Sequence, residues 1–235
     1  MTEHFKFKEV FDRKELEYCF RFRYEIHSVS LNKYVLKETF FSIDFDIYDT
    51  HSKHYAMFLG DLIVGYIRIV MPRSEYSNET AIALCKEWSL PGYTNFMLTG
   101  EYAPFPFLSY EGIPESYWDY FKQIEIKNEL IREASRLTMH PGYRSLSNSK
   151  FLVECALAIY ILMDIEMPHA VLDCNSRHRP LYEFYGFKPI DGAYTFHGLK
   201  KLALFLPAIP VHLRTRLHEM SIEYQQTGKI EKTYE

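Results

Sequence analysis

The chain has 235 residues, of which 47% are hydrophobic and 25% are charged, and its formal net charge is −4. One globular domain spanning residues 1–235 is expected, because a chain of this length can bury a substantial core. No uncharged run approaches twenty apolar residues, so we predict no membrane-spanning helix. The charged N-terminal segment excludes a secretory signal peptide. Weak acidity argues against a nucleic-acid-binding protein, which needs a basic face.

The cysteines indicate a cellular compartment. Cys19, Cys85, Cys155 and Cys174 lie far apart and form no C-x-x-C pair, so neither a zinc ribbon nor a disulfide framework is expected. We therefore predict a protein of the reducing cytoplasm. Residues 1–119 carry 12 Lys and Arg against 18 Asp and Glu, whereas the rest of the chain carries 15 against 13. The weak overall acidity is therefore compatible with an acidic small molecule or carrier docking locally on the second half.

Hydrophobic spacing predicts three features in the first half. Residues 13–30 are expected to form an amphipathic helix, because their apolar side chains recur near the helical period. Two short β-rich runs flank Gly60 and Asp61, which predicts a hairpin. Residues 73–128 begin with an irregular stretch that is too long for a structureless loop, so we expect a partly helical insert or a substrate lid.

The second half alternates strands and helices, which predicts an α/β fold with a mixed sheet. Residues 210–235 are expected to form a last amphipathic helix and a tail. The other predicted strands are 129–139, 169–175 and a closing pair within 194–206, and the other predicted helices are 151–167 and 179–187.

A loop of small residues separates the strand that ends near Met139 from the following helix. Arg144, Ser147 and Ser149 lie in it, and unpaired N–H groups at such a helix N-terminus bind phosphate. The alternative is that these serines only cap the helix or form turns.

Charged residues in the first half and in the predicted strand 129–139 form a second candidate set. Arg23 on an amphipathic helix commonly faces solvent, and Glu133 and Arg136 would point to opposite faces of a regular strand. Asp49 with His51 and His54 suggests a metal, but no further ligand has a fitting spacing, so no metal is expected. The set is Arg23, Asp46, Asp49, Arg68, Glu133 and Arg136.

The stretch from Asn175 to Phe187 resembles a known family. Asn175, Leu181, Tyr182, Gly186 and Phe187 match the spacing of the Asn…Leu-Tyr…Gly-Phe element of the GNAT acyltransferase superfamily. Its pyrophosphate loop reads Gln/Arg-x-x-Gly-x-Gly/Ala, and the loop here resembles it with serine at both small positions. The residues implied to bind the phosphate end of an acyl thioester are Arg144, Ser147, Ser149 and Asn175.

A broader resemblance runs from about residue 10 to about residue 205. The charged set occurs in the order found in acyl-homoserine-lactone synthases and in long-chain N-acyl amino acid synthases. Both are GNAT-fold enzymes that take a fatty acyl group from acyl carrier protein. The resemblance implies a GNAT-like mixed, mostly antiparallel central sheet with splayed central strands, flanked by helices.

The same resemblance implies residue roles. Glu133 would be the base that deprotonates the amine, Tyr182 would protonate the leaving thiolate, and Arg136 would assist in catalysis. The alternatives are a packed aromatic for Tyr182 and a structural ion-pair network for the charged set. The residues implied to bind the amine acceptor are Arg23, Asp46, Asp49 and Arg68, because arginine binds carboxylate well.

The acceptor separates the two related families. Homoserine-lactone synthases carry a tryptophan soon after the first arginine, and residues 30–42 here contain none, although Tyr34, Phe40 and Phe41 are aromatic. We therefore expect a transfer of a fatty acyl group from acyl carrier protein, or from acyl-CoA, to an amino acid. This acyl-phosphopantetheine thioester is a co-substrate, and no tightly bound cofactor is expected. Alternatives are a lactone synthase using S-adenosylmethionine, an acetyl-CoA-dependent N-acetyltransferase and a non-catalytic binding module.

Overall fold

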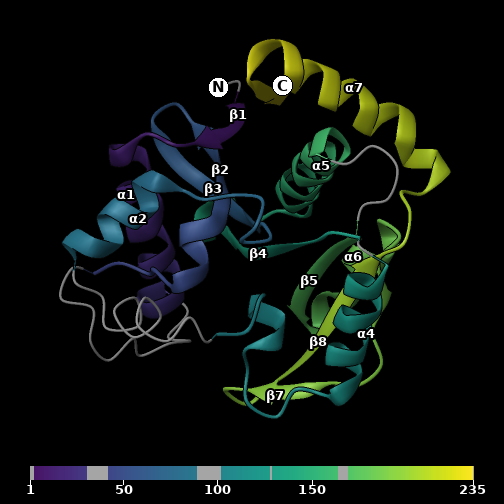
Figure 1. The fold of residues 1–235 in the computed structure, drawn as a ribbon. Coiled ribbons are helices and arrows are strands. Elements are labelled where there is room, and N and C mark those ends of the chain that lie inside the picture. The colour runs from purple at the N-terminus through teal and green to yellow at the C-terminus, as the bar shows by residue number, and fades with distance from the viewer. Residues whose placement is uncertain (1–2, 31–41, 89–101, 128, 164–168, 235) are drawn as a thin grey trace.

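The computed structural model describes residues 3–30, 42–88, 102–127, 129–163 and 169–234 (Figure 1). Their strands form one nine-stranded sheet in the order β6-β8-β5-β4-β3-β2-β1-β9, with β7 paired to β8. The strands are β1 (Glu3–Val10), β2 (Ser52–Leu59), β3 (Leu62–Val70), β4 (Ile131–Met139), β5 (His169–Asn175), β6 (Lys188–Pro189), β7 (Tyr194–Phe196), β8 (Leu199–Leu206) and β9 (Lys229–Tyr234).

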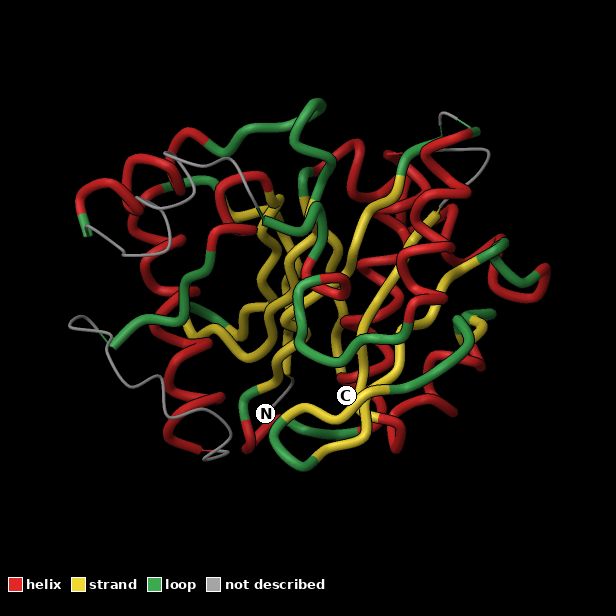
Figure 2. The backbone as a smooth tube through the Cα atoms, turned by 60° about the horizontal axis from the view of Figure 1, so that its bottom comes forward, coloured by secondary structure: helices red, strands yellow, loops and turns green. Residues whose placement is uncertain are grey.

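Helices cover both faces of the sheet, so that the strands form the middle layer (Figure 2). Helices α5 and α7 pack together on one face, while α1 and α2 lie on the opposite side of β1–β3 (Figure 1). Helix α4 covers the β5–β8 end of that second face. The helices are α1 (Arg13–Tyr24), α2 (Glu79–Glu87), α4 (Glu115–Ile126), α5 (Leu146–Met163), α6 (Arg179–Phe184) and α7 (Val211–Thr227).

The two central strands separate along their length. Strands β4 and β5 are parallel and pair only from Ile131 with His169 to Ala134 with Leu172. Beyond that point β4 continues to Met139 and β5 to Asn175, but the two strands no longer pair with each other. All other strand pairs are antiparallel. The predicted mixed, mostly antiparallel sheet with splayed central strands is confirmed.

Most predicted elements of the first half are present. Residues 13–30 form α1 and a following π-helical turn, with Asp12 as the N-cap. The predicted hairpin is β2–β3, and Gly60 adopts φ +58 in its turn, a conformation that favours glycine. Residues 73–128 contain α2, α4 and the short helix η3 (Pro106–Leu108). The insert is therefore partly helical, as predicted.

The sequence interpretation missed the last two strands on one side of the sheet, β1 and the edge strand β9. The sequence analysis predicts no strand in residues 3–10 and places residues 229–234 in the C-terminal tail. In the structure β1 pairs with β2 and β9, which brings the N and C ends together (Figure 1). Phe5 and Phe7 carry a period of two that identifies the strand, and both are buried.

Helix α5 is the one helix of the described residues that bears on the expectation about membrane spans. By length and composition alone this helix could cross a membrane, but 61% of its 18 residues are buried inside the protein. It packs between the sheet and α7 as a core helix. A side chain at Gly65 on β3 would lie 3.0 Å from Met139 Sδ and 3.3 Å from Leu152 Cδ2. This glycine therefore lets α5 approach the sheet closely.

Candidate active site

A cavity of about 170 Å³ occupies the gap where β4 and β5 separate. Val153, Ala156, Leu157 and Tyr160 line it from α5, at a spacing that places all four on one helix face. This wall is apolar apart from the Tyr160 hydroxyl, which donates to the Arg132 carbonyl at 3.2 Å. The polar lining comes from the strands and includes Arg68, Glu133, Ser135, Arg136, Asp173 and Lys201.

Glu133 lines this cavity from the paired part of β4, just before the strands separate. Its side chain is buried, with 1% of the residue exposed, and Oε2 accepts a 3.0 Å hydrogen bond from the Phe107 N–H of η3. Burial raises the pKa of Glu133 to about 8, and the Phe107 N–H only partly offsets this. Near neutral pH the carboxyl therefore exchanges protons readily, which is the property that a general base or acid needs.

Arg23, Arg68 and Arg136 form an ion cluster with three aspartates beside the cavity. Arg23 donates to Asp49 at 2.7 Å and to Asp44 at 3.1 Å, and both partners are buried. Arg68 donates to Asp49 at 2.7 Å, and it also bonds to Asp46 and to the Ser135 hydroxyl. His27 completes the cluster, with Nδ1 2.9 Å from Asp44 Oδ2.

The spacing of Asp46 and Asp49 has a local structural cause. The two residues form a capping box around the short helix η2 (Ile47–His51). Asp46 accepts from the Tyr48 N–H at 3.0 Å, and Asp49 accepts from the Asp46 N–H at 2.8 Å. The capping box holds both carboxylates next to Arg68. The same two residues therefore cap the start of η2 and accept hydrogen bonds from the arginine.

A β-bulge places Arg136. Arg68 pairs with Ser135 and Tyr66 with Thr138, so β4 has one residue more than β3 between these pairs. Arg136 takes φ +56, which is strained for a non-glycine residue. Its guanidinium donates to Asp46 at 2.9 Å. The expectation that Glu133 and Arg136 point to opposite faces is therefore wrong, because the bulge interrupts the alternation. The Arg136 guanidinium reaches Asp46 beside Arg68, on the face of β4 that carries Ser135 and Glu133.

The charges within the cluster balance. Burial disfavours the charged forms of Asp44 and Asp46, but the nearby arginines outweigh it and lower the pKa of both carboxyls. Three guanidinium groups thus face three carboxylates. Arg23 is fully buried and does not line the cavity, whereas the Arg136 side chain is 23% exposed and does.

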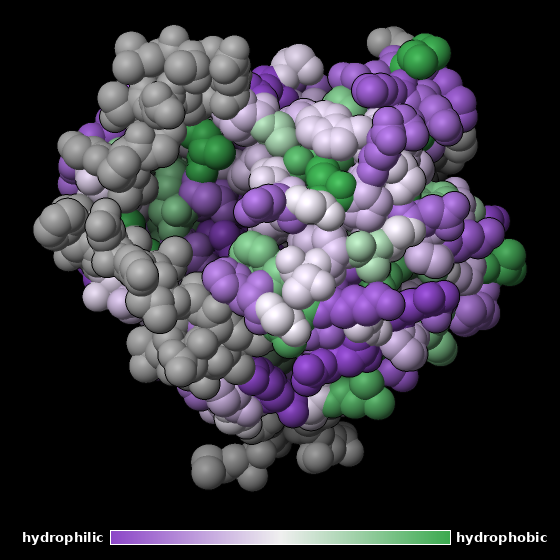
Figure 3. Space-filling view, turned by 90° about the horizontal axis from the view of Figure 1, so that it is seen from below, coloured by the Kyte–Doolittle hydropathy of each residue, from purple (hydrophilic) through white to green (hydrophobic). Residues whose placement is uncertain are grey.

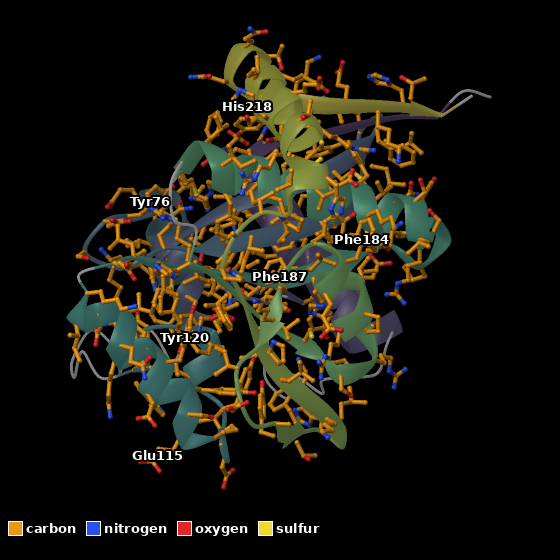
Figure 4. The ribbon with its side chains drawn as sticks, turned by 90° about the vertical axis from the view of Figure 1, so that its right-hand side faces the viewer. Tyr76, Glu115, Tyr120, Phe184, Phe187 and His218 are labelled. Carbon is orange, nitrogen blue, oxygen red and sulfur yellow. The ribbon has the colours of Figure 1, made fainter. Side chains whose placement is uncertain are left out.

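The motif around Tyr182 borders the same cavity. Asn175, Tyr182 and Phe187 all line it. Burial raises the pKa of Tyr182, so its hydroxyl keeps a proton at neutral pH. Phe187 lies near the centre of the molecule, whereas Phe184 lies at the edge of α6 and is 47% exposed (Figure 4).

Three of the four candidate phosphate-binding residues do not line the cavity. Arg144 is exposed and donates through Nε to the Met139 carbonyl at 3.1 Å. Ser147 accepts from Lys232 Nζ at 3.1 Å, and Ser149 lies within the first turns of α5. The N-cap is Ser145, whose hydroxyl accepts from the Asn148 N–H at 3.0 Å. The structure therefore groups Asn175 with the cavity and the other three with the N-terminal end of α5.

Two cavity residues were missed by the sequence interpretation. Asp173 on β5 and Lys201 on β8 form a 2.7 Å ion pair that lines the cavity. The signal was available, because Asp173 is a charged residue inside the apolar run HAVLDCN. A charge within a buried strand needs a partner and commonly marks a site.

The histidines near Asp49 have other roles. His54 Nδ1 lies 2.7 Å from the Tyr66 hydroxyl, and burial lowers the pKa of His54 to about 4. Across the part of the chain that the structure describes, no group of three or more His, Cys, Asp or Glu side chains is arranged to hold a metal ion. Tyr34, Phe40 and Phe41, the candidate aromatic slot, lie outside the described residues.

The surface on the lower side of the molecule is hollowed beside the residues drawn in grey, and hydrophilic side chains lie in this hollow (Figure 3).

All four cysteines are free and buried. Cys174 is one of the cavity-lining residues, and burial raises the pKa of its thiol to about 12. It is therefore a neutral, apolar part of the wall rather than a nucleophile.

Neither a family model nor a curated protein matches the chain. Solved structures do share its fold. An acyl-CoA N-acyltransferase from Pseudomonas aeruginosa is 12% identical over 87% of this chain and 99% of that chain, with a TM-score of 0.52. BjaI, a CoA-dependent acyl-homoserine lactone synthase solved with SAM and isopentyl-CoA, is 15% identical over 92% and 88%, with a TM-score of 0.56. MesI, another CoA-dependent acyl-homoserine lactone synthase, is 19% identical over 89% and 88%, with a TM-score of 0.52. At these identities the likeness shows a common fold.

Proposed function

We propose that the protein is an N-acyltransferase that moves a fatty acyl group from acyl carrier protein, or from acyl-CoA, to the amine of an amino acid. The observation that carries this proposal is the position of Glu133. A carboxyl with a pKa of about 8 lines the cavity at the point where the strands begin to splay, with an apolar wall on one side and polar side chains on the other. An acyl thioester and an amine both fit such a site.

The chemistry assigns a role to each group. The acyl chain lies against the α5 face, and the pantetheine arm enters where β4 and β5 no longer pair. Backbone N–H groups on that edge of β4 then polarise the thioester carbonyl. Glu133 takes one proton from the substrate ammonium, and the neutral amine attacks the carbonyl carbon. When the tetrahedral intermediate collapses, the carbon–sulfur bond breaks and Tyr182 protonates the thiolate. The attacking nitrogen gives up its second proton, which restores the Tyr182 phenol and leaves a neutral amide, and Glu133 releases the first proton to solvent.

Product analysis tests this proposal. Purified enzyme is incubated with dodecanoyl-acyl carrier protein or dodecanoyl-CoA, and separately with each common amino acid and with S-adenosylmethionine. We expect an N-acyl amino acid, detected by mass spectrometry, and free thiol. A lactone with release of methylthioadenosine would replace the acceptor but keep the donor. Activity with acetyl-CoA alone would indicate an acetyltransferase, and a bound acyl chain without turnover would indicate a binding module.

The apolar cavity wall is expected to set the acyl-chain length. Tyr160 closes the cavity where β4 and β5 are still paired, and Ala156 lies one turn closer to the opening. Ala156→Leu should remove room for about two methylenes. Since each buried methylene contributes about 0.8 kcal/mol, kcat/KM for the longest good donor should fall roughly 15-fold.

Kinetics across a donor series from octanoyl to hexadecanoyl check this result. Ala193→Leu, at an exposed position, is the matched control and should leave the profile unchanged. An Ala156→Leu profile identical to that of the parent enzyme would show that the acyl chain lies elsewhere.

An exposed basic set is proposed to dock the acidic carrier protein. Arg144, Arg177 and Arg179 are exposed, and Lys150 lies half-buried next to them in the first turns of α5. Reversing Arg177 and Arg179 to Glu should weaken carrier binding at least 10-fold at low salt, and the loss should shrink as salt rises. Calorimetric titration at two ionic strengths measures it. Binding that ignores both salt and charge reversal would remove this docking site and leave acyl-CoA as the donor.

A further inference from the structure

A half-buried ion pair in the cavity has no part in the mechanism above. Lys201 Nζ donates to Asp173 Oδ2 at 2.7 Å, and the two side chains are 16% and 7% exposed. They lie on neighbouring antiparallel strands, where Asn175 pairs with Lys201 and Asp173 with Ala203. Both line the cavity. A pair that is partly removed from water contributes little net stability, because desolvation offsets the attraction between its charges.

The pair is positioned next to the proposed base. Glu133 is in register with Val171 on β5, so Asp173 lies two residues further on and on the same face of the sheet. Strand β4 has already separated there, which leaves space between the two carboxyls. The Tyr194 hydroxyl lies near Asp173 and lowers the pKa of its carboxyl. Within the described residues, Asp173 Oδ1 accepts no well-formed hydrogen bond.

The arginine cluster, in contrast, is already neutralised. Arg68 and Arg136 line the cavity, but their guanidinium groups already have carboxylate partners. Arg68 is paired with Asp46 and Asp49. Arg136 is paired with Asp46 and Asp44. Binding a substrate carboxylate there would break one of these ion pairs. Lys201 has one bond to Asp173, and an ammonium group has three donors. A substrate carboxylate can therefore bind Lys201 without breaking its existing pair.

We propose that Asp173 and Lys201 together bind the α-ammonium and α-carboxylate groups of the acceptor amino acid. This inference rests on the proposed function. Asp173 Oδ1 accepts from the ammonium, Lys201 Nζ donates to the carboxylate, and the amine nitrogen lies between Asp173 and Glu133. The zwitterion thus meets one charge of each sign, and its nitrogen is held beside the base.

Burial raises the pKa of Asp173, although Lys201 opposes this. An arriving ammonium favours the ionised carboxylate, so acceptor binding stabilises the charge that holds it. The negative charge of Asp173 is also one of the causes that raise the pKa of Glu133. The pair therefore both positions the amine and strengthens the base.

A paired-acceptor assay tests the assignment. The probes are each common amino acid and its own α-carboxamide, which keeps the amine but lacks the carboxylate, with dodecanoyl-acyl carrier protein as donor. The parent enzyme should prefer the amino acid at least 10-fold in kcat/KM. Lys201→Met should abolish this preference by raising KM for the amino acid more than for the carboxamide, so that the two kcat/KM values become equal.

Three further variants make the result specific. Lys201→Arg keeps the charge and should retain most of the preference. Lys200→Met, an identical change at the exposed neighbour on β8, should behave as the parent enzyme. Asp173→Asn should slow both acceptors, because each carries an ammonium. Thermal unfolding and donor titration of every variant establish that the fold and donor binding are retained.

Each outcome gives a decision. If the parent enzyme does not discriminate, or if Lys201→Met slows both acceptors equally, the zwitterion-binding role is wrong while the N-acyltransferase stands. If Lys201→Met does not fold, the preference shown by Lys201→Arg decides instead, and its loss overturns the role. If the parent enzyme acylates no amine of either class, the proposed function fails and this inference fails with it.

Discussion

Glu133→Gln is expected to lower kcat by about 100-fold or more, as a positioned general base contributes a factor of 10² to 10⁴. Glutamine has nearly the same shape and can still accept the hydrogen bond from the Phe107 N–H, but it cannot take up a proton. Donor affinity should therefore be unchanged. Steady-state and single-turnover kinetics, with donor titration as the control, measure the two effects separately.

The pH dependence of the parent enzyme belongs to the same prediction. The base must be ionised, so kcat/KM of the free enzyme should rise with pH and level off above about 8, the pKa of Glu133. Folded Glu133 binds its proton more tightly than the unfolded chain, whose value is near 4.5. Its contribution to stability is therefore present below 4.5 and is lost as pH rises through 8.

Glu133→Gln should remove both dependences. The residual kcat/KM of this variant should no longer rise as pH approaches 8, and its free energy of unfolding at pH 9 should exceed that of the parent enzyme. A variant with the kinetics of the parent enzyme would show that Glu133 is structural and that the mechanism is wrong.

Asp49→Asn is expected to destabilise the fold by about 3–5 kcal/mol, which is the cost of removing one partner from a buried ion pair. Asp49 accepts from Arg23 and Arg68, each at 2.7 Å, and from the Asp46 N–H. Asparagine leaves both guanidinium groups short of a negative charge in the interior. Chemical denaturation followed by circular dichroism measures the loss.

The matched control for this variant is Asp61→Asn in the exposed turn of the β2–β3 hairpin, expected within about 0.5 kcal/mol of the parent protein. The cluster also predicts acid sensitivity. Because the pKa values of Asp44 and Asp46 are lowered in the folded state, their stabilisation is present above about 3.8 and is lost as pH falls further. An Asp49→Asn protein as stable as the control would show that the cluster does not hold α1 to the sheet.

Local patterns in the sequence determined much of this protein. The spacing of apolar side chains identified α1, α5 and α7, and the Gly60–Asp61 turn identified the β2–β3 hairpin. These signals are local, because helix faces and turns depend on residues a few positions apart. The resemblance to GNAT acyltransferases predicted the splayed sheet. It also named Glu133, Arg136 and Tyr182, which the structure brings to one cavity.

Only the tertiary structure decided how these residues act together. The bulge at Arg136 depends on the register between β3 and β4, and no periodicity within β4 predicts it. Likewise, Lys201 contacts Asp173 only because β8 pairs with β5. Strand β9 pairs with β1, although the two lie at opposite ends of the sequence. The arginines were named as acceptor ligands from sequence, but whether aspartates already neutralise them is a matter of contacts in space. Charge, unlike hydrophobic period, acquires its role from the partner that folding places beside it.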